Sequence, residues 1–545
     1  MDRRRPTAGV LTLGLLALVA VLGGLSLLKG GFYIGKHEGD TLHLAELVLR
    51  MGQGEWPHLD FMTPIGVLAI APMALFVALG QGFGHAIVLS QILVALVLLP
   101  ATVWIATSRL RGVWAWLYGA FVMVLCLALV HGEANVAVSI SMHYNRWAWA
   151  VTYLLLPVVM IAPARERPWP DGAILGLGVA ALALIKVTYV VAVFPGLLIG
   201  LIARRWWRTT AVAAAAGLLA AGLLTALAGP EFWLAYVADL RTVASTDIRP
   251  NPGESLAAVV ASPAWFGASF TLLAVIVFLR QAGRMTEGMV LLFLMPGLFY
   301  ITYQNYGNDP QWLMLVAILA LALRPDTPVR NRLGWDMGQA LGYAGAAAIA
   351  FGLGSALNLA YSPLRHAATD TDKMAPLLSR LPAHADVRAY ENRIYGINTS
   401  LAADGPDTPF AAYRPRAERK DLTEFGGRTW GDCEMAGGLD AYFEVVADDL
   451  AGAGYAGRAI GAADLFSGFW MYGDFRPVRG AAPWNYGVPS GFRNADFIVL
   501  PLCPFAAQVE TELLKAMTRD GWGIRVERKT PVYWLLAVTP PRNSP

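Results

Sequence analysis

The chain has 545 residues, of which 56% are apolar and 15% are charged, and its formal net charge is +3. Soluble globular proteins average about 25% charged residues, so the composition excludes an ordinary soluble protein and indicates one that crosses a membrane several times. The small net charge gives no indication of nucleic-acid binding.

The first apolar run, Val10 to Leu28, is long enough to cross a bilayer. Three arginines, Arg3 to Arg5, precede it. Basic residues are retained on the cytoplasmic side, so we expect the N-terminus inside the cell and the first loop, residues 29–63, outside. Because the run lacks a small-residue cleavage site, we interpret it as a retained span and not as a signal peptide.

The first loop concentrates ionisable side chains beside this span. Such groups are costly to hold near a bilayer and are functional candidates for that reason. Within the loop, Thr41 to Met51 has the pattern of a short helix lying along the membrane, with Asp40 placed to cap it. The candidate residues are Glu38, Asp40 and Asp60, together with His37, His43 and His58.

Apolar runs recur from residue 64 to residue 359, and basic clusters separate them. All these clusters can be cytoplasmic if residues 64–107, which hold two apolar runs, make one net crossing, and the total is then about 11 spans. Two crossings there would give about 12 spans and an intracellular C-terminal end. We favour one. The clusters are Arg109/Arg111, Arg165/Arg167, Arg204/Arg205/Arg208, Arg280/Arg284 and Arg324/Arg330/Arg332.

After about Tyr361 charged residues, Pro and Gly return, and short apolar runs alternate with a helical stretch, Phe505–Arg519. This pattern is typical of a soluble α/β domain. We therefore divide the chain into a transmembrane domain, residues 1–360, and an extracytoplasmic domain, residues 361–545. The predicted strands are Val387–Tyr390, Phe497–Pro501 and Tyr533–Val538.

Three cysteines are too few for a disulfide scaffold. Cys126 lies in an apolar run, which leaves Cys433 and Cys503 as a bridge that an oxidising periplasm would allow. The Ala-, Gly- and Arg-rich composition is typical of bacteria. We therefore expect an inner-membrane protein whose C-terminal domain faces the periplasm.

Two acidic positions of the first loop carry a resemblance to a known family. Glu38-Gly39-Asp40 follows the first span, and Asp60-Phe61-Met62-Thr63-Pro64 leads into the next apolar run. This arrangement resembles the first extracytoplasmic loop of the GT-C glycosyltransferases that use polyprenyl-phosphate sugars, such as bacterial aminoarabinose transferases and protein O-mannosyltransferases. The chain departs from the family pattern, because the usual Asp-Glu pair is Glu-Gly-Asp and the usual Lys-Pro-Pro is Met-Thr-Pro.

The resemblance covers mainly residues 1–325. It implies a polytopic α-helical membrane protein of about 11 to 13 spans, followed here by the soluble α/β domain. It also implies an inverting transfer of sugar from a polyprenyl-phosphate donor to an extracytoplasmic acceptor, which can be a glycan, a lipid or a protein.

Such a transfer needs a base that removes the acceptor's proton, and a carboxylate near the membrane interface suits that role. We expect Asp40 to be the base, with Glu38 able to replace it, and Asp60 to position the acceptor or the base. The alternatives are a helix cap for Asp40 and a turn residue for Asp60.

The three histidines of the loop could instead join these carboxylates as ligands of a divalent metal. The spacing of His37, His43 and His58 fits no compact zinc signature, so this is the weaker alternative. Hydrogen bonds to lipid headgroups or to phosphate are the simpler interpretation, and we expect no cofactor.

The leaving phosphate needs cationic or amide donors. Arg146 stands among aromatic residues at the predicted outer end of a span, and Lys186 is the only charge in Ala173–Ala203. We expect both to bind the donor phosphate. The alternatives are a side chain that reaches for the headgroups, for Arg146, and a simple span end, for Lys186.

A polar, aromatic stretch near residue 305 is also predicted to lie outside. Amides, a carboxylate and aromatic rings are the groups that bind sugar hydroxyls and sugar faces. We expect it to bind the sugar or the acceptor, with a polar capping turn as the alternative. The candidate residues are Tyr303, Asn305, Asn308, Asp309 and Gln311.

Two functions of other classes compete with the enzyme. A transporter or flippase for lipid-linked glycans would use the same cations, and a non-catalytic scaffold for envelope assembly would need none of these roles. Transporters usually show an internal repeat and little soluble mass. No repeat is visible in the sequence and the terminal domain is large, so we favour the enzyme.

Overall fold

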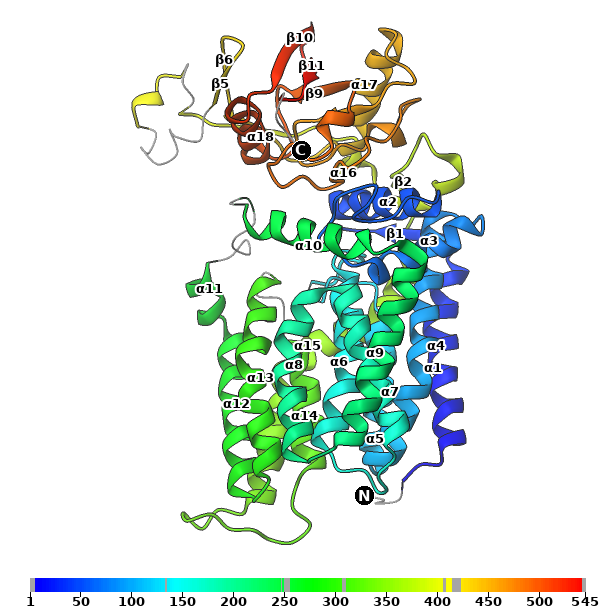
Figure 1. The fold of residues 1–545 in the computed structure, drawn as a ribbon, viewed down its shortest axis with the longest axis vertical. Coiled ribbons are helices and arrows are strands. Elements are labelled where there is room, and N and C mark those ends of the chain that lie inside the picture. Colours follow the sequence, from blue (N-terminus) through cyan, green and yellow to red (C-terminus); the bar gives the residue numbers. More distant parts are fainter. Residues whose placement is uncertain are drawn as a thin grey trace.

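The computed structural model describes residues 5–132, 135–246, 248, 255–305, 310–404, 408–413 and 423–541. Long helices lie side by side along the long axis of the molecule, and a unit of helices and strands covers one end of this bundle, opposite the N-terminus (Figure 1). The bundle helices are α1 (Ala8–Leu28), α4 (Phe83–Arg109), α5 (Gly112–Leu127), α6 (His143–Met160), α7 (Pro168–Ile185), α8 (Val187–Ala203), α9 (Trp207–Ala228), α12 (Pro263–Gln281), α13 (Met285–Gln304), α14 (Trp312–Ala322) and α15 (Met337–Ala367).

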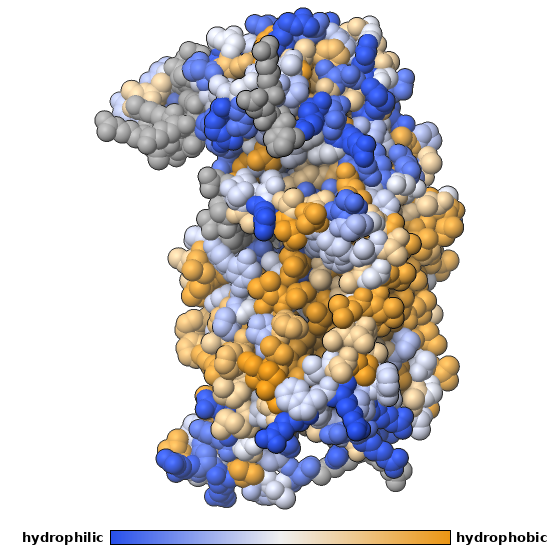
Figure 2. Space-filling model, viewed as in Figure 1, coloured by the Kyte–Doolittle hydropathy of each residue, from blue (hydrophilic) through white to orange (hydrophobic). Residues whose placement is uncertain are grey.

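The surface of the bundle is apolar. On the face shown in Figure 2, apolar residues cover the bundle and polar residues cover its two ends. Leu218, Leu219 and Leu223 of α9 are 73%, 73% and 62% exposed, as side chains that face lipid are. Among the described residues, six helices are long and apolar enough to cross a membrane. The chain is therefore a polytopic helical membrane protein, which confirms this part of the prediction.

The predicted basic clusters include residues that tie the helices together at the N-terminal end of the bundle. Arg109, at the end of α4, donates a hydrogen bond to Asp171, at the start of α7, at 2.7 Å. Arg204, which follows α8, pairs at 2.9 Å with Glu287 at the start of α13, and donates to the carbonyl of Met160 at the end of α6. These contacts place the ends of several helices together, as the topology prediction requires.

Only one of the two apolar runs in residues 64–107 becomes a long helix. The first run forms a 3-10 turn (Val67–Ala69) and the eight-residue helix α3 (Ala71–Ala78). A helix of that length rises about 12 Å, well short of the hydrocarbon core of about 30 Å. The second run forms α4, with 27 residues. This supports the single crossing that the sequence favoured.

The first loop and the C-terminal part of the chain share a sheet. β1 (Phe32–Ile34) pairs in parallel with β3 (Val387–Tyr390), which pairs antiparallel with β2 (Met374–Pro376). Next comes α2 (Glu38–Gly52), which lies across the end of the bundle under the C-terminal unit (Figure 1). The predicted domain boundary at residue 360 falls inside α15, so the two parts are joined more closely than the composition indicates.

The C-terminal unit is built on a four-stranded sheet in the order β10-β11-β9-β8. β9 pairs antiparallel with β11 and parallel with β8. α18 buries Leu513 and other apolar residues against Ile498 and Leu500 of β9. The unit is thus a small α/β structure, as predicted. Its main elements are α16 (Glu391–Ile394), α17 (Leu439–Gly452), β8 (Ile460–Ala462), β9 (Phe497–Pro501), α18 (Ala507–Arg519), β10 (Gly523–Lys529) and β11 (Tyr533–Thr539).

A disulfide joins Cys433 to Cys503, with Cα atoms 4.9 Å apart, and Cys126 is buried in α5. The predicted pairing is confirmed. It links β7 (Cys433–Met435) to the segment after β9. The remaining small strands pair two by two: β4 (Thr399–Leu401) with β7, and β5 (Thr423–Phe425) with β6 (Arg428–Trp430).

Candidate functional site

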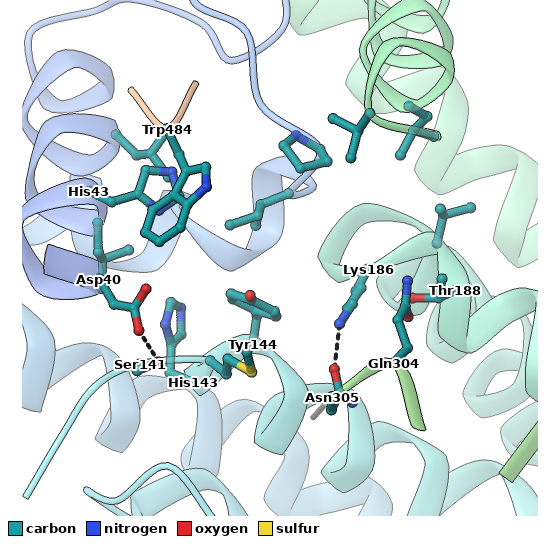
Figure 3. A pocket seen from close by; sticks show the side chains of 18 of the residues that line it. Asp40, His43, Ser141, His143, Tyr144, Lys186, Thr188, Gln304, Asn305 and Trp484 are labelled. Carbon is teal, nitrogen blue, oxygen red and sulfur yellow. Dashed lines mark hydrogen bonds between the residues drawn. The ribbon is translucent and has the colours of Figure 1, made fainter. Parts of the chain in front are cut away.

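A cavity of about 530 Å³ lies where the bundle, the first loop and the C-terminal unit meet (Figure 3). Cavities of this size are typical of small-molecule sites. Its walls come from α2, the start of α6, the junction of α7 and α8, the end of α13, α10 (Glu231–Ala244) and a loop near residue 485. The polar and aromatic residues that line it are Asp40, His43, Ser141, His143, Tyr144, Lys186, Thr188, Tyr300, Tyr303, Gln304, Asn305, Trp484 and Tyr486.

α2 presents Asp40 to this cavity (Figure 3). The helix begins at Glu38, and its N-cap position is His37 in a left-handed conformation with φ 68°. Asp40 is therefore inside the first turn, and its alternative role as the helix cap is wrong. Its Oδ2 accepts a hydrogen bond from Ser141 Oγ at 2.7 Å. Within the described part of the chain its other oxygen has no donor, so it can accept a proton from a bound molecule.

Gly39 allows close packing between α2 and the C-terminal unit. The ring of Phe466, from the C-terminal unit, packs directly on Gly39, and a Cβ added there would lie 2.7 Å from Phe466 Cζ. Real carbon atoms do not approach so closely, so a side chain at this position would push the ring away. The Glu-Gly-Asp sequence thus allows the C-terminal unit to contact α2 beside Asp40.

The segment before α6 carries Ser141 and is fixed by Arg146. This arginine is fully buried, and its Nη1 donates to the carbonyl oxygens of Val130 and Ser141. It does not line the cavity. Its buried position supports neither the predicted contact with the donor phosphate nor the alternative contact with lipid headgroups. Arg146 instead holds the backbone that positions the partner of Asp40.

Lys186 lines the cavity at the junction of α7 and α8 (Figure 3). It is extended (φ −157°, ψ 106°) and interrupts the helical run between Ile185 and Val187. Its Nζ donates to Asn305 Oδ1 at 2.8 Å and to Asn145 Oδ1 at 3.0 Å. These two acceptors are neutral amide oxygens, and the ammonium group also lies over the ring of Tyr144, 5.3 Å from its centre. The lone lysine of the apolar run therefore faces the cavity, as the sequence indicated.

The end of α13 supplies part of the predicted sugar-binding stretch. Tyr303 and Asn305 line the cavity. Gln311 is buried outside it, where its backbone carbonyl accepts a hydrogen bond from Tyr153, so its expected contact with the sugar is not supported. Asn308 and Asp309 lie outside the described residues.

The other two predicted carboxylates contact the C-terminal unit away from the cavity. Glu38 forms a two-pronged ion pair with Arg393, in which the second contact is 2.8 Å. Asp60 accepts from the backbone N–H of Trp56 at 2.9 Å and lies 3.3 Å from Arg479. Neither lines the cavity. The position of Asp60 supports its alternative as a turn residue, and Glu38 is engaged in a structural contact.

The three histidines of the first loop have separate surroundings. His37 contacts Ser139 Oγ at 2.9 Å, and His43 lies beside Trp484. His58 pairs with Asp239 on α10 at 2.8 Å. Burial raises the pKa of Asp239, and the hydrogen bond from His58 opposes this. Within the described residues no group of three or more His, Cys, Asp or Glu side chains could hold a metal, so the metal alternative is not supported.

Asp40 is the single carboxylate, and Lys186 the single lysine or arginine, among the described residues that line the cavity. One end of the cavity can therefore remove a proton, and another can bind an anion. Sequence reasoning missed Ser141, His143, Trp484 and Tyr486. The clustered aromatics of Pro483-Trp484-Asn485-Tyr486 were the one signal that could have indicated the last two.

Comparison with family models, curated proteins and solved structures finds no match to this chain. The site must therefore be interpreted from its own geometry.

Proposed function

We propose that the chain is an integral membrane glycosyltransferase of the GT-C type, which moves a sugar from a polyprenyl-phosphate donor to an extracytoplasmic acceptor. The observation that carries this proposal is that Asp40 and Lys186 line the same cavity, at the end of an apolar bundle. A lipid phosphate can reach such a cavity from the bilayer while its tail stays among the helices. A soluble acceptor can reach it from the side of the C-terminal unit.

The chemistry follows from these two groups. A hydroxyl oxygen of the acceptor attacks the anomeric carbon of the donor sugar, and its proton passes to Asp40. The bond between that carbon and the phosphate oxygen breaks on the opposite face, so the configuration inverts. The electron pair leaves with the polyprenyl phosphate, whose charge Lys186 stabilises, with Asn305 beside it. Ser141 keeps the carboxylate of Asp40 oriented through its hydrogen bond.

The orientation in the membrane is part of the proposal. We assign one crossing to each bundle helix, α1, α4 to α9 and α12 to α15, which makes eleven. With the N-terminus in the cytoplasm, the basic clusters stay inside. An odd number of crossings then puts the cavity and the C-terminal unit outside, in the periplasm of a bacterial cell. The disulfide is compatible with that oxidising compartment.

The proposal is tested with the purified full-length protein in liposomes that contain polyprenyl-phosphate sugars of several kinds. A transferase given envelope extract releases free polyprenyl phosphate in amounts equal to the sugar transferred. Lipid-linked sugar that crosses the bilayer intact would establish the transporter instead. Absence of both sugar release and donor binding would refute the proposal.

Lys186→Met gives the proposal a residue-level test. Hydrogen bonds to charged groups contribute about 1.5–3 kcal/mol, so donor affinity should fall at least about tenfold. Lys515→Met is the matched control, because Lys515 pairs with Glu512 on α18, outside the cavity. Equal donor affinities of the two variants would remove Lys186 from the phosphate site.

A further inference from the structure

The C-terminal unit forms one wall of the cavity with aromatic side chains. Trp484 and Tyr486 both line it, although they lie far along the chain from the helices of the bundle. Figure 3 shows Trp484 beside His43, on the same side as Asp40, with Tyr144 between that group and Lys186. The rings of His43 and Trp484 are 5.5 Å apart and tilted by 59°. The aromatic wall therefore belongs to the end of the cavity where the proton is removed.

The loop that carries Trp484 is fixed from several directions. The N–H of Asn485 donates to the carbonyl of Leu465 at 2.9 Å, and the hydroxyl of Thr246, just after α10, donates to the carbonyl of Tyr486 at 2.7 Å. The rings of Phe466 and Trp484 pack edge to face, with centres 5.3 Å apart and planes at 88°. A ring held in this way loses little conformational entropy when a ligand covers it.

The chemistry of this end fits a sugar ring. A pyranose has a face of C–H groups, which an aromatic face attracts, and an edge of hydroxyl groups, which need donors and acceptors. Trp484 lines this end of the cavity with its indole ring, and Asp40 and Ser141 supply oxygen atoms to the same cavity. We propose that Trp484 is the stacking platform of the acceptor and that the acceptor is therefore a saccharide. This inference rests on the proposed function and adds the substrate class to it.

A peptide acceptor fits the same walls less well. Extended peptides are usually bound by an exposed strand edge or a long groove that pairs with their backbone. The described residues that line this cavity come from helices and loops, and no strand contributes to them. The cavity is also compact, at about 530 Å³. A terminal sugar with one reacting hydroxyl is compact, and it needs no strand edge for binding.

The test measures binding of acceptor analogues to the full-length protein in detergent by saturation-transfer NMR. The probes are methyl glycosides of the common hexopyranoses and pentopyranoses, with a serine- and threonine-containing hexapeptide for comparison. We expect at least one glycoside to bind the wild type through its ring protons. Trp484→Phe should weaken this binding by less than about threefold, and Trp484→Leu by about tenfold or more, because only the first keeps an aromatic face.

The control is Trp522→Leu, which removes an indole of the C-terminal unit outside the cavity and should leave glycoside binding unchanged. Binding of the peptide and not of the glycosides, binding of no glycoside, or wild-type affinity in Trp484→Leu would each overturn the inference. Donor affinity measured in the same samples separates the two proposals. If the donor binds through Lys186 and no glycoside binds, the inference fails alone. If no donor binds, the proposed function fails.

Discussion

Gly39→Ala tests whether the C-terminal unit is pressed against α2 beside Asp40. The new methyl group would lie 2.7 Å and 3.2 Å from two carbon atoms of Phe466. The ring cannot move aside freely, because it is 6% exposed and packs against Trp484 and Phe505, with ring centres 5.3 Å and 5.9 Å away. Overpacking of this kind costs about 1–3 kcal/mol, and over most of this range the cost exceeds the gain of about 1 kcal/mol from replacing a helical glycine with alanine.

The expected result is a lower thermal unfolding temperature in detergent and slower sugar transfer, because a displaced Phe466 moves Trp484 with it. Phe466→Leu should restore part of both losses in the double variant, with a coupling of about 0.5–3 kcal/mol between the two sites. Gly24→Ala is the matched control, since that helical glycine in α1 has nothing within 4 Å of an added Cβ. An unfolding temperature and rate equal to those of the wild type in Gly39→Ala would refute this account of the contact.

Three further predictions concern the parts that support the site. Burial raises the pKa of Asp440 to about 8, so the folded state keeps a proton that the unfolded state releases near pH 4. The free energy of unfolding should therefore fall as the pH rises from about 4 to about 8. Asp440→Asn should flatten this fall in thermal melts and raise the stability at pH 8 by more than about 1 kcal/mol. Replacing Cys433 and Cys503 with serine should destabilise the C-terminal unit by ~4 kcal/mol, because the bridge closes a loop with a sequence separation of 70 residues; denaturant unfolding with and without reductant measures this, and equal stability would contradict it. Arg146→Lys should lower the unfolding temperature and slow transfer without changing donor affinity, because it loosens the segment with Ser141; a loss of donor affinity alone would return Arg146 to the phosphate site.

Local patterns in the sequence were sufficient for the bundle and for part of the site. Apolar runs longer than a bilayer predict spans whatever the rest of the chain does, and one charge in such a run, Lys186, must find a polar cavity or an interface. The strands β3 and β9 also agree with their predicted bounds, because short alternating or apolar runs are typical of strands. Asp40 was predicted as a site residue from its place after the first span, and it lines the cavity.

The residues that sequence reasoning misplaced have partners far away in the chain. Glu38 pairs with Arg393, which lies 355 residues later in the chain. No local pattern shows that a carboxylate is engaged by such a partner. Arg146 was misjudged for a related reason, because its acceptors are backbone carbonyls, which every sequence contains. The aromatic wall was missed because only the folded chain brings Trp484 to Asp40.

The rate of polyprenyl-phosphate release in Asp40→Asn tests the central proposal most directly. The amide keeps the size of the side chain but cannot remove a proton, and a general base contributes about 10²–10⁴-fold to the rate. Asp60→Asn is the matched control, since Asp60 belongs to the same loop but lies outside the cavity. The account predicts a loss of this size in Asp40→Asn, with donor affinity unchanged and with Asp60→Asn near the wild type. Wild-type release in Asp40→Asn would contradict it.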